Sequence, residues 1–327
     1  MTDVSTRDAA RLQPAWKVVL IRPESVTFLL LILGAIGASW LSPFFADIAY
    51  IMESFTYYSE FAIVALVLTM VIISGEIDLS GAAMMALSAC LFGVAYQAGL
   101  GVPVAILVSL ASGVVMGAFN GFLVINMQLP SIIVTIGTLT LYRGLAQVIV
   151  GDKSIGKFPT WFNGVDYRLI LDVPVPVILF FVASPILALF LGTTSLGRQI
   201  YQIGTSPVAA RHAGIRVRQI KMGLFIAMGL ASSIAGLMTA SRLASVRYDL
   251  GTGGELQMVL IVMLGGTYIF GGRGTILGTF LAAWLLVILA TGMTVANIAI
   301  NTQLTVMGLL LIVSIIATNL IYARTQR

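Results

Sequence analysis

The sequence predicts an all-α, polytopic membrane protein with about ten transmembrane helices and both termini in the cytoplasm. Of its 327 residues, 59% are hydrophobic and 9% are charged, whereas soluble domains carry about 25% charged residues. Apolar runs of about 20 residues, the length that crosses about 30 Å of hydrocarbon, recur from end to end. Basic residues collect in segments that a ten-span count places on one side. These observations leave no room for a sizeable soluble domain.

Ten apolar runs separated by polar or Gly/Pro-rich pieces are the predicted spans. They are 26–45, 59–75, 79–98, 103–126, 131–150, 173–193, 222–240, 256–270, 275–293 and 299–321. The predicted layout is a cytoplasmic tail over 1–25, a membrane domain over 26–321 with a cytoplasmic loop at 195–221, and a second tail over 322–327. The first run is about twenty residues long, which favours an uncleaved span over a signal peptide.

Charge gives an independent prediction of topology. The tail before the first span, the loop 195–221 and the tail after residue 321 share one side, and the positive-inside rule makes that side the cytoplasm. Their basic residues are Arg7, Arg11, Lys17, Arg22, Arg198, Arg211, Arg216, Arg218, Lys221, Arg324 and Arg327.

One segment does not fit this topology. Residues 241–256 should be external, yet they contain Arg242 and Arg247, balanced by Asp249 and Glu255. The alternative is a partly inserted segment, with the short run 256–270 re-entrant. Glu60, at the outer end of the second span, needs no special role on this reading.

Small residues predict close helix packing. Gly113 and Gly117 form a GxxxG pair, which lets helices approach closely in lipid. Bundle packing is the simpler interpretation, and a functional hinge is the alternative. Residues 73–89 and 270–286 share a turn followed by a small-residue helix, which hints at an internal repeat of the kind found in transporters.

The sequence lacks the motifs of several enzyme classes. It has no GxxxxGK[ST] phosphate loop, no GxSxG and no HExxH. One cysteine and one histidine exclude an intrachain disulfide and a multi-His metal site. The net charge of +5 is explained by cytoplasmic loops, so it does not indicate nucleic-acid binding. A transport protein that binds no metal or cofactor, and takes its energy from an ion gradient or a partner, is favoured over an enzyme.

The loop 195–221 contains start and stop signals for a short helix. Ser206 is the expected N-cap, Pro207 the first helical residue and Gly214 the stop. A short helix held between two spans on the cytoplasmic face is suited to transmit motion from a soluble motor. The alternative is a solvated basic loop that only sets topology.

The residues SPVAARHAGIRVRQIK of this loop resemble the coupling loop of permease subunits from bacterial sugar-import ABC transporters. GEIDLS after the second span, IIVTIGTLTLYRGLAQVIVG at 132–151 and YIFGGRGTILGTFLAA at 268–283 extend the resemblance. Together they cover most of the chain from 59 to 321. The family is the ribose, xylose, rhamnose and autoinducer-2 type, and GEIDLS resembles the rhamnose permeases most.

The resemblance implies import of a monosaccharide, with rhamnose as the first candidate and ribose, xylose or an autoinducer-2-like sugar as the others. It implies a second permease, identical or different, two cytoplasmic ATPase domains that hydrolyse ATP, and a periplasmic sugar-binding protein. The short helix would then contact the ATPase, with Arg211 and Arg216 meeting its surface. The predicted coupling residues are Ser206, Pro207, Ala209, Ala210, Arg211, Gly214, Ile215 and Arg216.

The stretch SGEIDLSG places two carboxylates between apolar runs. The span count puts it in a tight turn near the cytoplasmic side, where Asp78 is the expected N-cap of the third span. Direct contact with substrate or gate is the alternative for Asp78. Glu76 needs a basic partner, expected at an interface with the ATPase or the second permease. Gly75 and Ser80 complete the predicted turn.

Polar residues at membrane depth are candidates for the substrate path. Asn120, Thr135, Thr138 and Arg143 are predicted to line it, since a sugar pore needs weak hydrogen-bonding walls. The first three are alternatively interhelical hydrogen-bonding groups, and Arg143 alternatively extends outward to the interface.

Two rival functions remain open. In a secondary transporter Glu76 or Asp78 would carry a proton, and this chain alone would catalyse uptake that an uncoupler abolishes. A membrane-embedded enzyme or assembly scaffold is the second rival, and a scaffold would show no substrate-dependent stimulation of an ATPase.

Overall fold

Long apolar helices form most of the protein. The computed structural model describes residues 23–41, 45, 47–165 and 168–324, so the predicted tail over 1–25 lies almost wholly outside the described residues. Within the described part, six helices are long and apolar enough to cross a membrane. They are α6 with its π-helical end η2 (Gly101–Gly121 and Phe122–Asn126), α7 (Ser131–Val150), α8 (Val175–Thr193), α11 (Val217–Leu243), α13 (Ile276–Val295) and α14 (Ile300–Arg324).

Shorter apolar helices fill the remaining positions of the bundle. They are α2 (Pro23–Leu41), α3 (Ile48–Thr56), α4 (Ser59–Ile73), α5 (Gly81–Gln97) and α12 (Gly254–Leu264). The pair α3 and α4 is bent by 72° and counts as a seventh candidate span if taken together. Each of the ten predicted ranges overlaps one helix, and the protein is a polytopic helical membrane protein.

The predicted span 256–270 is wrong in its extent. Helix α12 has 11 residues, about 16 Å of length, which is half of what a hydrocarbon core requires. Residues 265–275 form turns, with left-handed Gly266, Gly271 and Gly272. The apolar part of the run is followed by Gly265, Gly266 and Thr267, and Gly266 supplies the left-handed conformation that ends the helix. In contrast, α14 continues past the predicted boundary at 321.

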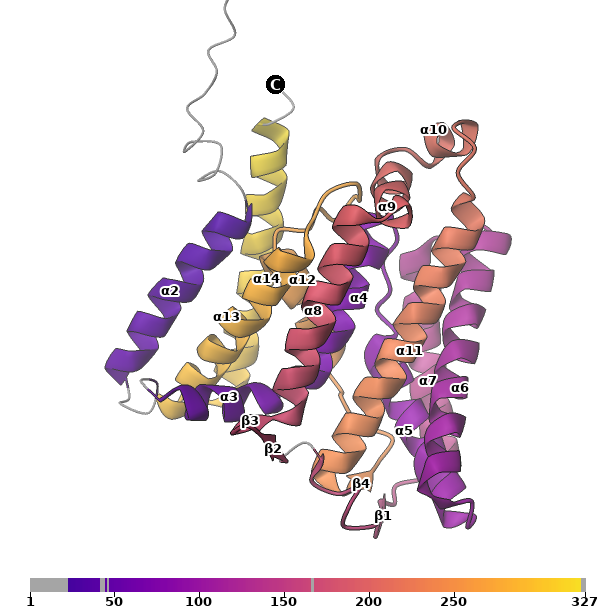
Figure 1. The fold of residues 1–327 in the computed structure, drawn as a ribbon, viewed down its shortest axis with the longest axis vertical. Helices are drawn as coiled ribbons and strands as arrows, with labels where there is room; N and C mark the ends of the chain where they lie inside the picture. Colours follow the sequence, from indigo (N-terminus) through magenta and orange to yellow (C-terminus); the bar gives the residue numbers. More distant parts are fainter. Residues whose placement is uncertain (1–22, 42–44, 46, 166–167, 325–327) are drawn as a thin grey trace, which may run out of the picture.

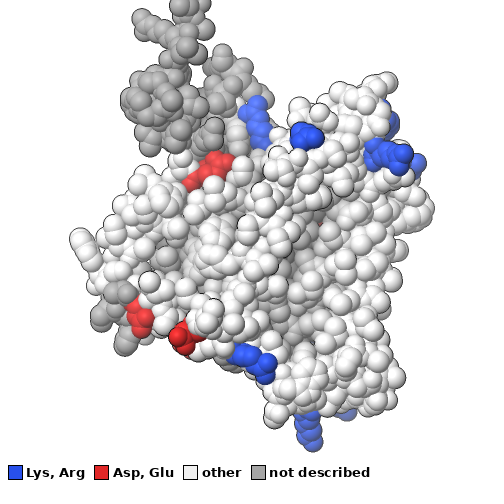
Figure 2. All heavy atoms as spheres, viewed as in Figure 1, with Lys and Arg blue, Asp and Glu red and all other residues white. Residues whose placement is uncertain are grey.

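The two ends of the bundle are different (Figure 1). Helices α9 (Ser195–Thr205) and α10 (Pro207–His212) lie at one end, here called the α10 end. The start of α2 and the end of α14 lie at the same end (Figure 1). Figure 2 shows Lys and Arg gathered near α10, an acidic patch at the same end on the side of α2, and both acidic and basic side chains at the opposite end.

Two small antiparallel strand pairs lie at the opposite end (Figure 1). Strand β1 (Ile155–Gly156) pairs with β4 (Ser245–Val246), and β2 (Leu169–Ile170) pairs with β3 (Val173–Pro174). Apart from these pairs, the all-α prediction is correct for the described residues.

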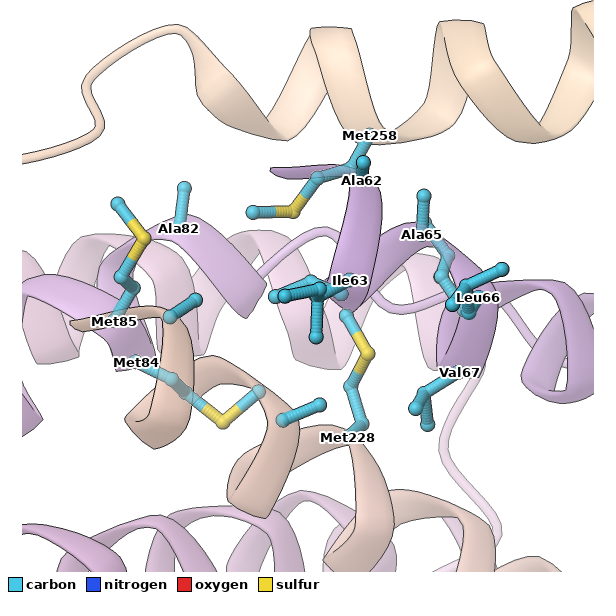
Figure 3. Packing of buried hydrophobic residues seen from close by; sticks show 14 of the residues in the cluster. Ala62, Ile63, Ala65, Leu66, Val67, Ala82, Met84, Met85, Met228 and Met258 are labelled. Atoms are coloured by element: carbon cyan, nitrogen blue, oxygen red, sulfur yellow. The ribbon is translucent and has the colours of Figure 1, made fainter. Parts of the chain in front are cut away.

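Helix α4 lies in the core of the bundle. Every one of its residues except Phe61 is buried, which explains why its sequence is apolar without periodicity. Methionines fill the space around it, with Met84 and Met85 from α5, Met228 from α11 and Met258 from α12 (Figure 3). Flexible thioethers are suited to irregular gaps between helices that cross at different angles.

Helices α6 and α11 pack through glycines. A Cβ added at Gly113 would collide with the backbone of Gly229, and one at Gly117 with the backbone of Phe225. The predicted GxxxG pair is therefore a helix-packing motif. This contact fixes α11 against α6 near the middle of both helices.

Candidate functional site

Three backbone segments meet at the α10 end. The carbonyl oxygen of Ile73, at the end of α4, accepts a hydrogen bond of 2.8 Å from the amide of Gly272. Gly204 of α9 lies against both residues, so that an added Cβ would collide with each of them. A Cβ on Gly271 would come within 2.8 Å of the Cα of Gly75. Residues 73–89 and 270–286 each begin with a turn that leads into a helix rich in small residues. The two turns are thus in direct contact.

The chain forms the predicted turn at Ser74 and Gly75, and then a segment without regular secondary structure over 76–80, before α5 begins at Gly81. This segment brings Asp78 and Ser80 into the interior, where both are buried. The backbone of Ile77 is held by α7: its amide donates to the Ser131 hydroxyl at 3.1 Å, and its carbonyl accepts from Thr135 at 3.3 Å. The segment is non-helical, and its backbone polar groups are enclosed by helices. Non-helical backbone inside a membrane protein must be shielded from lipid in this way.

Asp78 is the centre of a buried hydrogen-bond network. Its Oδ1 accepts from the amide of Ser80 at 2.8 Å and from the Ser80 hydroxyl at 2.6 Å. The Asn120 amide donates to Asp78 Oδ2 at 3.4 Å and to Ser80 Oγ at 2.8 Å. Tyr142 in turn donates to Asn120 Oδ1 at 2.9 Å. The network links the 76–80 segment with α6 and α7.

The prediction that Asp78 is the N-cap of the third span is wrong. The N-cap residue of α5 is Ser80, and no side chain caps the first turn. Asp78 instead binds the amide of the N-cap residue itself, which forms a tight turn just before the helix. The sequence pattern of an acid two residues before a Ser-Gly helix start fits both arrangements, so the pattern alone could not separate them.

Glu76 has a partner within the chain. Lys221 Nζ lies 2.5 Å from Glu76 Oε1, with both side chains largely buried. The prediction of a partner at an interface with another subunit is therefore wrong. Lys221 lies in the first turns of α11, shortly after α10, and the ion pair connects the exit of the α9–α10 loop to the segment that carries Asp78.

Helix α10 has the predicted start and stop. The Ser206 hydroxyl accepts from the amide of Ala209 at 3.2 Å, and Pro207 occupies the first helical position. Gly214 follows the helix with φ of 81°, the left-handed conformation that glycine adopts readily. The sequence signals for this helix are thus confirmed.

The faces of α10 differ partly from the expectation. Ala210 is buried against Ile203 and Val217, so it joins the helix to the bundle and is not available to an outside partner. Arg211, Arg216 and Ala209 are exposed, as expected, and Ile215 is partly buried. The sequence reasoning missed Val208, whose side chain is 64% exposed beside Pro207. A branched apolar side chain directly after Pro207, in a short helix of otherwise small and basic residues, is the sequence signal that could have found it.

The predicted substrate-path residues bind other parts of the chain. Asn120 belongs to the Asp78 network and Thr135 holds Ile77, while Thr138 donates to the Thr135 carbonyl within α7 at 3.4 Å. The contacts of Asn120 and Thr135 with other segments agree with the hydrogen-bonding alternative considered for them, whereas the Thr138 bond lies within its own helix. A role in the substrate path stays a prediction.

The Arg143 side chain binds the loop between β4 and α12. Its Nη1 donates to the carbonyl oxygens of Tyr248 at 3.0 Å and Leu250 at 2.6 Å. It therefore holds the loop between β4 and α12 against α7.

A second ion pair explains the basic residue that did not fit the topology. Arg242 contacts Glu60 at 2.8 Å, and the Glu60 side chain is 1% exposed. Thr239 donates to the same Glu60 oxygen at 3.2 Å. Arg247 pairs with Asp249 at 3.1 Å on the surface. Glu60 thus has a role that the sequence analysis did not assign to it, and Arg242 is retained there by its buried partner.

These features define a class of protein: a multi-pass helical membrane protein with broken helices whose polar groups are enclosed in the bundle, an arrangement that transporters use. The particular family follows from comparison with known proteins. Residues 50–315 match the model of the branched-chain amino acid transport system / permease component family, and the chain belongs to this family. It is a multi-pass permease component of a bacterial membrane and not a catalytic subunit.

Curated relatives match over nearly the whole chain. The autoinducer 2 import system permease protein LsrD of Escherichia coli strain K12 is 33% identical over 322 residues, which cover 97% of this chain and 96% of that protein. The protein of the same name from Shigella flexneri matches equally, and that of Escherichia coli O157:H7 is 32% identical. No solved structure matches the chain. The relatives give the rhamnose assignment no specific support.

Proposed function

We propose that this chain is one permease of an ATP-driven importer for a small sugar-like solute, with autoinducer 2 as the first candidate and a monosaccharide as the second. In this proposal it crosses the inner membrane ten times, with both termini and α10 in the cytoplasm. A second permease, a cytoplasmic ABC ATPase subunit and a periplasmic binding protein complete the importer. The names of the relatives support the substrate class, and the charge distribution in Figure 2 supports the orientation.

The observation that carries the proposal is the continuous connection from α10 to the interior. Helix α10 is exposed and capped, and Lys221 follows it within ten residues. Lys221 pairs with Glu76, and Glu76 lies two residues before the buried Asp78. A push on α10 by the ATPase would therefore displace the 76–80 segment through an ion pair. Such a motion is useful only if the contacts differ between the inward- and outward-facing states.

The rival secondary transporter has less support from this geometry. Asp78 accepts three hydrogen bonds, two from Ser80 and one from Asn120. Glu76 forms an ion pair with Lys221. Both carboxylates thus have fixed hydrogen-bond or ion-pair partners within the chain. A proton carrier must release such partners in each cycle.

Reconstitution tests the proposal. The permease is placed in proteoliposomes with its candidate ATPase, second permease and binding protein, and ATP hydrolysis is measured with autoinducer 2, rhamnose, ribose and xylose. The expected result is stimulation by one of these solutes and no uptake by the permease alone. Uptake by this chain alone that an uncoupler abolishes would favour the secondary transporter, and the absence of stimulation by every solute would refute the proposal.

A further inference from the structure

A basic groove lies at the α10 end, between the start of α11 and the turn that joins η2 to α7. It encloses about 770 Å³. Its charged lining residues are Arg211, Arg218, Lys221 and Glu76, which leaves two positive charges in excess. Among the described residues, Glu76 pairs with Lys221, whereas neither arginine has an ion-pair partner. Two guanidinium groups thus face the groove without an anion.

The other wall of the groove is apolar and continues onto the outer surface of the bundle. Leu129 and Pro130 line the groove itself. Beside them, Met127, Ile132 and Ile133 are exposed, the last by 68%. Ile132 and Ile133 belong to the first turn of α7, a helix long and apolar enough to cross the membrane. The groove therefore has a positively charged opening, formed by Arg211 and Arg218, directly next to an apolar surface at the start of α7.

We propose that this groove binds an anionic phospholipid from the leaflet at the α10 end. Arg218 and Arg211 would hold the phosphate, because guanidinium groups bind phosphate oxygens in a bidentate manner. The acyl chains would cover Ile132 and Ile133. Basic pockets between membrane helices on the cytoplasmic side recognise lipid headgroups by the same chemistry.

The apolar wall favours a lipid over an acidic protein surface. A soluble partner with carboxylates could neutralise Arg211 and Arg218, but it would leave Ile132 and Ile133 uncovered at membrane depth. A free phosphate ion would likewise use only the charged half of the groove. An amphipathic anion matches both halves.

A lipid titration tests this proposal without any transport measurement. The full chain in detergent is titrated with phosphatidylglycerol, phosphatidylcholine or inorganic phosphate, and its thermal unfolding midpoint is followed. We expect a saturable increase with phosphatidylglycerol only. Arg218→Gln should raise the half-saturating lipid concentration at least about tenfold, as loss of a charge-assisted hydrogen bond requires. Arg218→Lys should give an intermediate value.

Arg198→Gln is the matched control. Arg198 is an exposed base of α9 at the same end, but its Nη1 donates to the Thr193 carbonyl and it does not line the groove. An equal response of both glutamine variants to phosphatidylglycerol would overturn the proposal, because binding would then depend on total charge alone. A shift with inorganic phosphate alone would also contradict it. So would an unchanged lipid response in Arg218→Gln together with weaker binding of the ATPase subunit, which would assign the groove to the protein partner.

Discussion

Glu60 and Glu76 flank the two ends of α4, and each is ion-paired with a base of α11. Glu60 pairs with Arg242 at the end of α11, and Glu76 pairs with Lys221 near its beginning. The two antiparallel helices are thereby fastened at both ends of the bundle. A displacement that begins at α10 would move α4 and α11 together, which gives the proposed coupling a route to the opposite face.

Glu76→Gln should spare folding and impair coupled transport. The substitution keeps the shape of the side chain and an oxygen that can accept from Lys221, but it leaves a largely buried ammonium without its counter-ion. The free energy of unfolding should therefore fall, but by less than the loss of about 3–5 kcal/mol that follows truncation of one partner of a buried pair. ATP hydrolysis and substrate uptake are measured together in proteoliposomes. The charge swap Glu76→Lys with Lys221→Glu should restore part of the coupling. Full transport by Glu76→Gln would show that the pair is not needed.

Asp78→Ala should lower the yield of folded protein. The substitution removes the acceptor for the Ser80 amide, the Ser80 hydroxyl and the Asn120 amide, and each buried donor left without a partner costs about 1–3 kcal/mol. Size-exclusion chromatography and thermal unfolding in detergent give the readout. Asp78→Asn is the matched control: it retains an acceptor for Ser80 and should lose less. Equal yields for Ala and the wild type would contradict a structural role.

Arg242→Ala should destabilise the protein far more than Arg247→Ala. The first substitution leaves the buried Glu60 carboxylate without its counter-ion, which costs about 3–5 kcal/mol. The second breaks an exposed pair with Asp249, worth about 0–1 kcal/mol. The two unfolding midpoints are compared under one set of detergent conditions. Similar midpoints would mean that the Glu60 site gains water or another partner once Arg242 is removed.

Gly204→Ala should disrupt the junction between α4, α9 and the 265–275 turns. The added methyl group would collide with the Ile73 carbonyl and the Gly272 amide, and both are backbone atoms that cannot rotate away. We expect loss of folded yield or a loosened junction, seen as faster proteolysis of the α9–α10 loop. Gly223→Ala in α11 meets open space and should stabilise the helix by up to about 1 kcal/mol.

Val208→Asp should weaken binding of the ATPase subunit without changing the stability of the permease. Val208 is exposed on α10 and touches no core cluster, so a charge there acts only on an outside partner. Pull-down of the ATPase by the purified permease provides the measurement. Ala210→Leu is the contrasting variant: it overpacks the contact with Ile203 and Val217 and should cost about 1–3 kcal/mol of stability. Unaltered ATPase binding by Val208→Asp would move the contact to another face of α10.

Local signals in the sequence predicted local structure well. The apolar runs located the helices, and the order Ser206, Pro207 and Gly214 located α10, because caps and stops depend only on neighbouring residues. The GxxxG pair predicted a helix contact for the same reason: glycine at that spacing removes the side chains that would separate two helices.

Partners distant in sequence could not be predicted in this way. Glu76 and Lys221 are separated by 145 residues, and Glu60 and Arg242 by 182. Nothing in the periodicity of either segment specifies which pair of helix ends meets. The extent of 256–270 failed for a different reason: the prediction followed the average hydrophobicity of the run, whereas Gly265 and Gly266 end the helix at Leu264.

The junction of Gly75, Gly204 and Gly271 is built from main-chain atoms, and this has a consequence for how such a permease can diversify. The hydrogen bond between the Gly272 amide and the Ile73 carbonyl does not depend on the identity of any surrounding side chain. Mutations that change the proposed solute route would then leave the proposed connection to the ATPase intact, provided that the three glycines remain. In the proposed importer, solute preference and coupling to ATP hydrolysis would therefore be separable by mutation. A new specificity could arise while the coupling to the ATPase is unchanged.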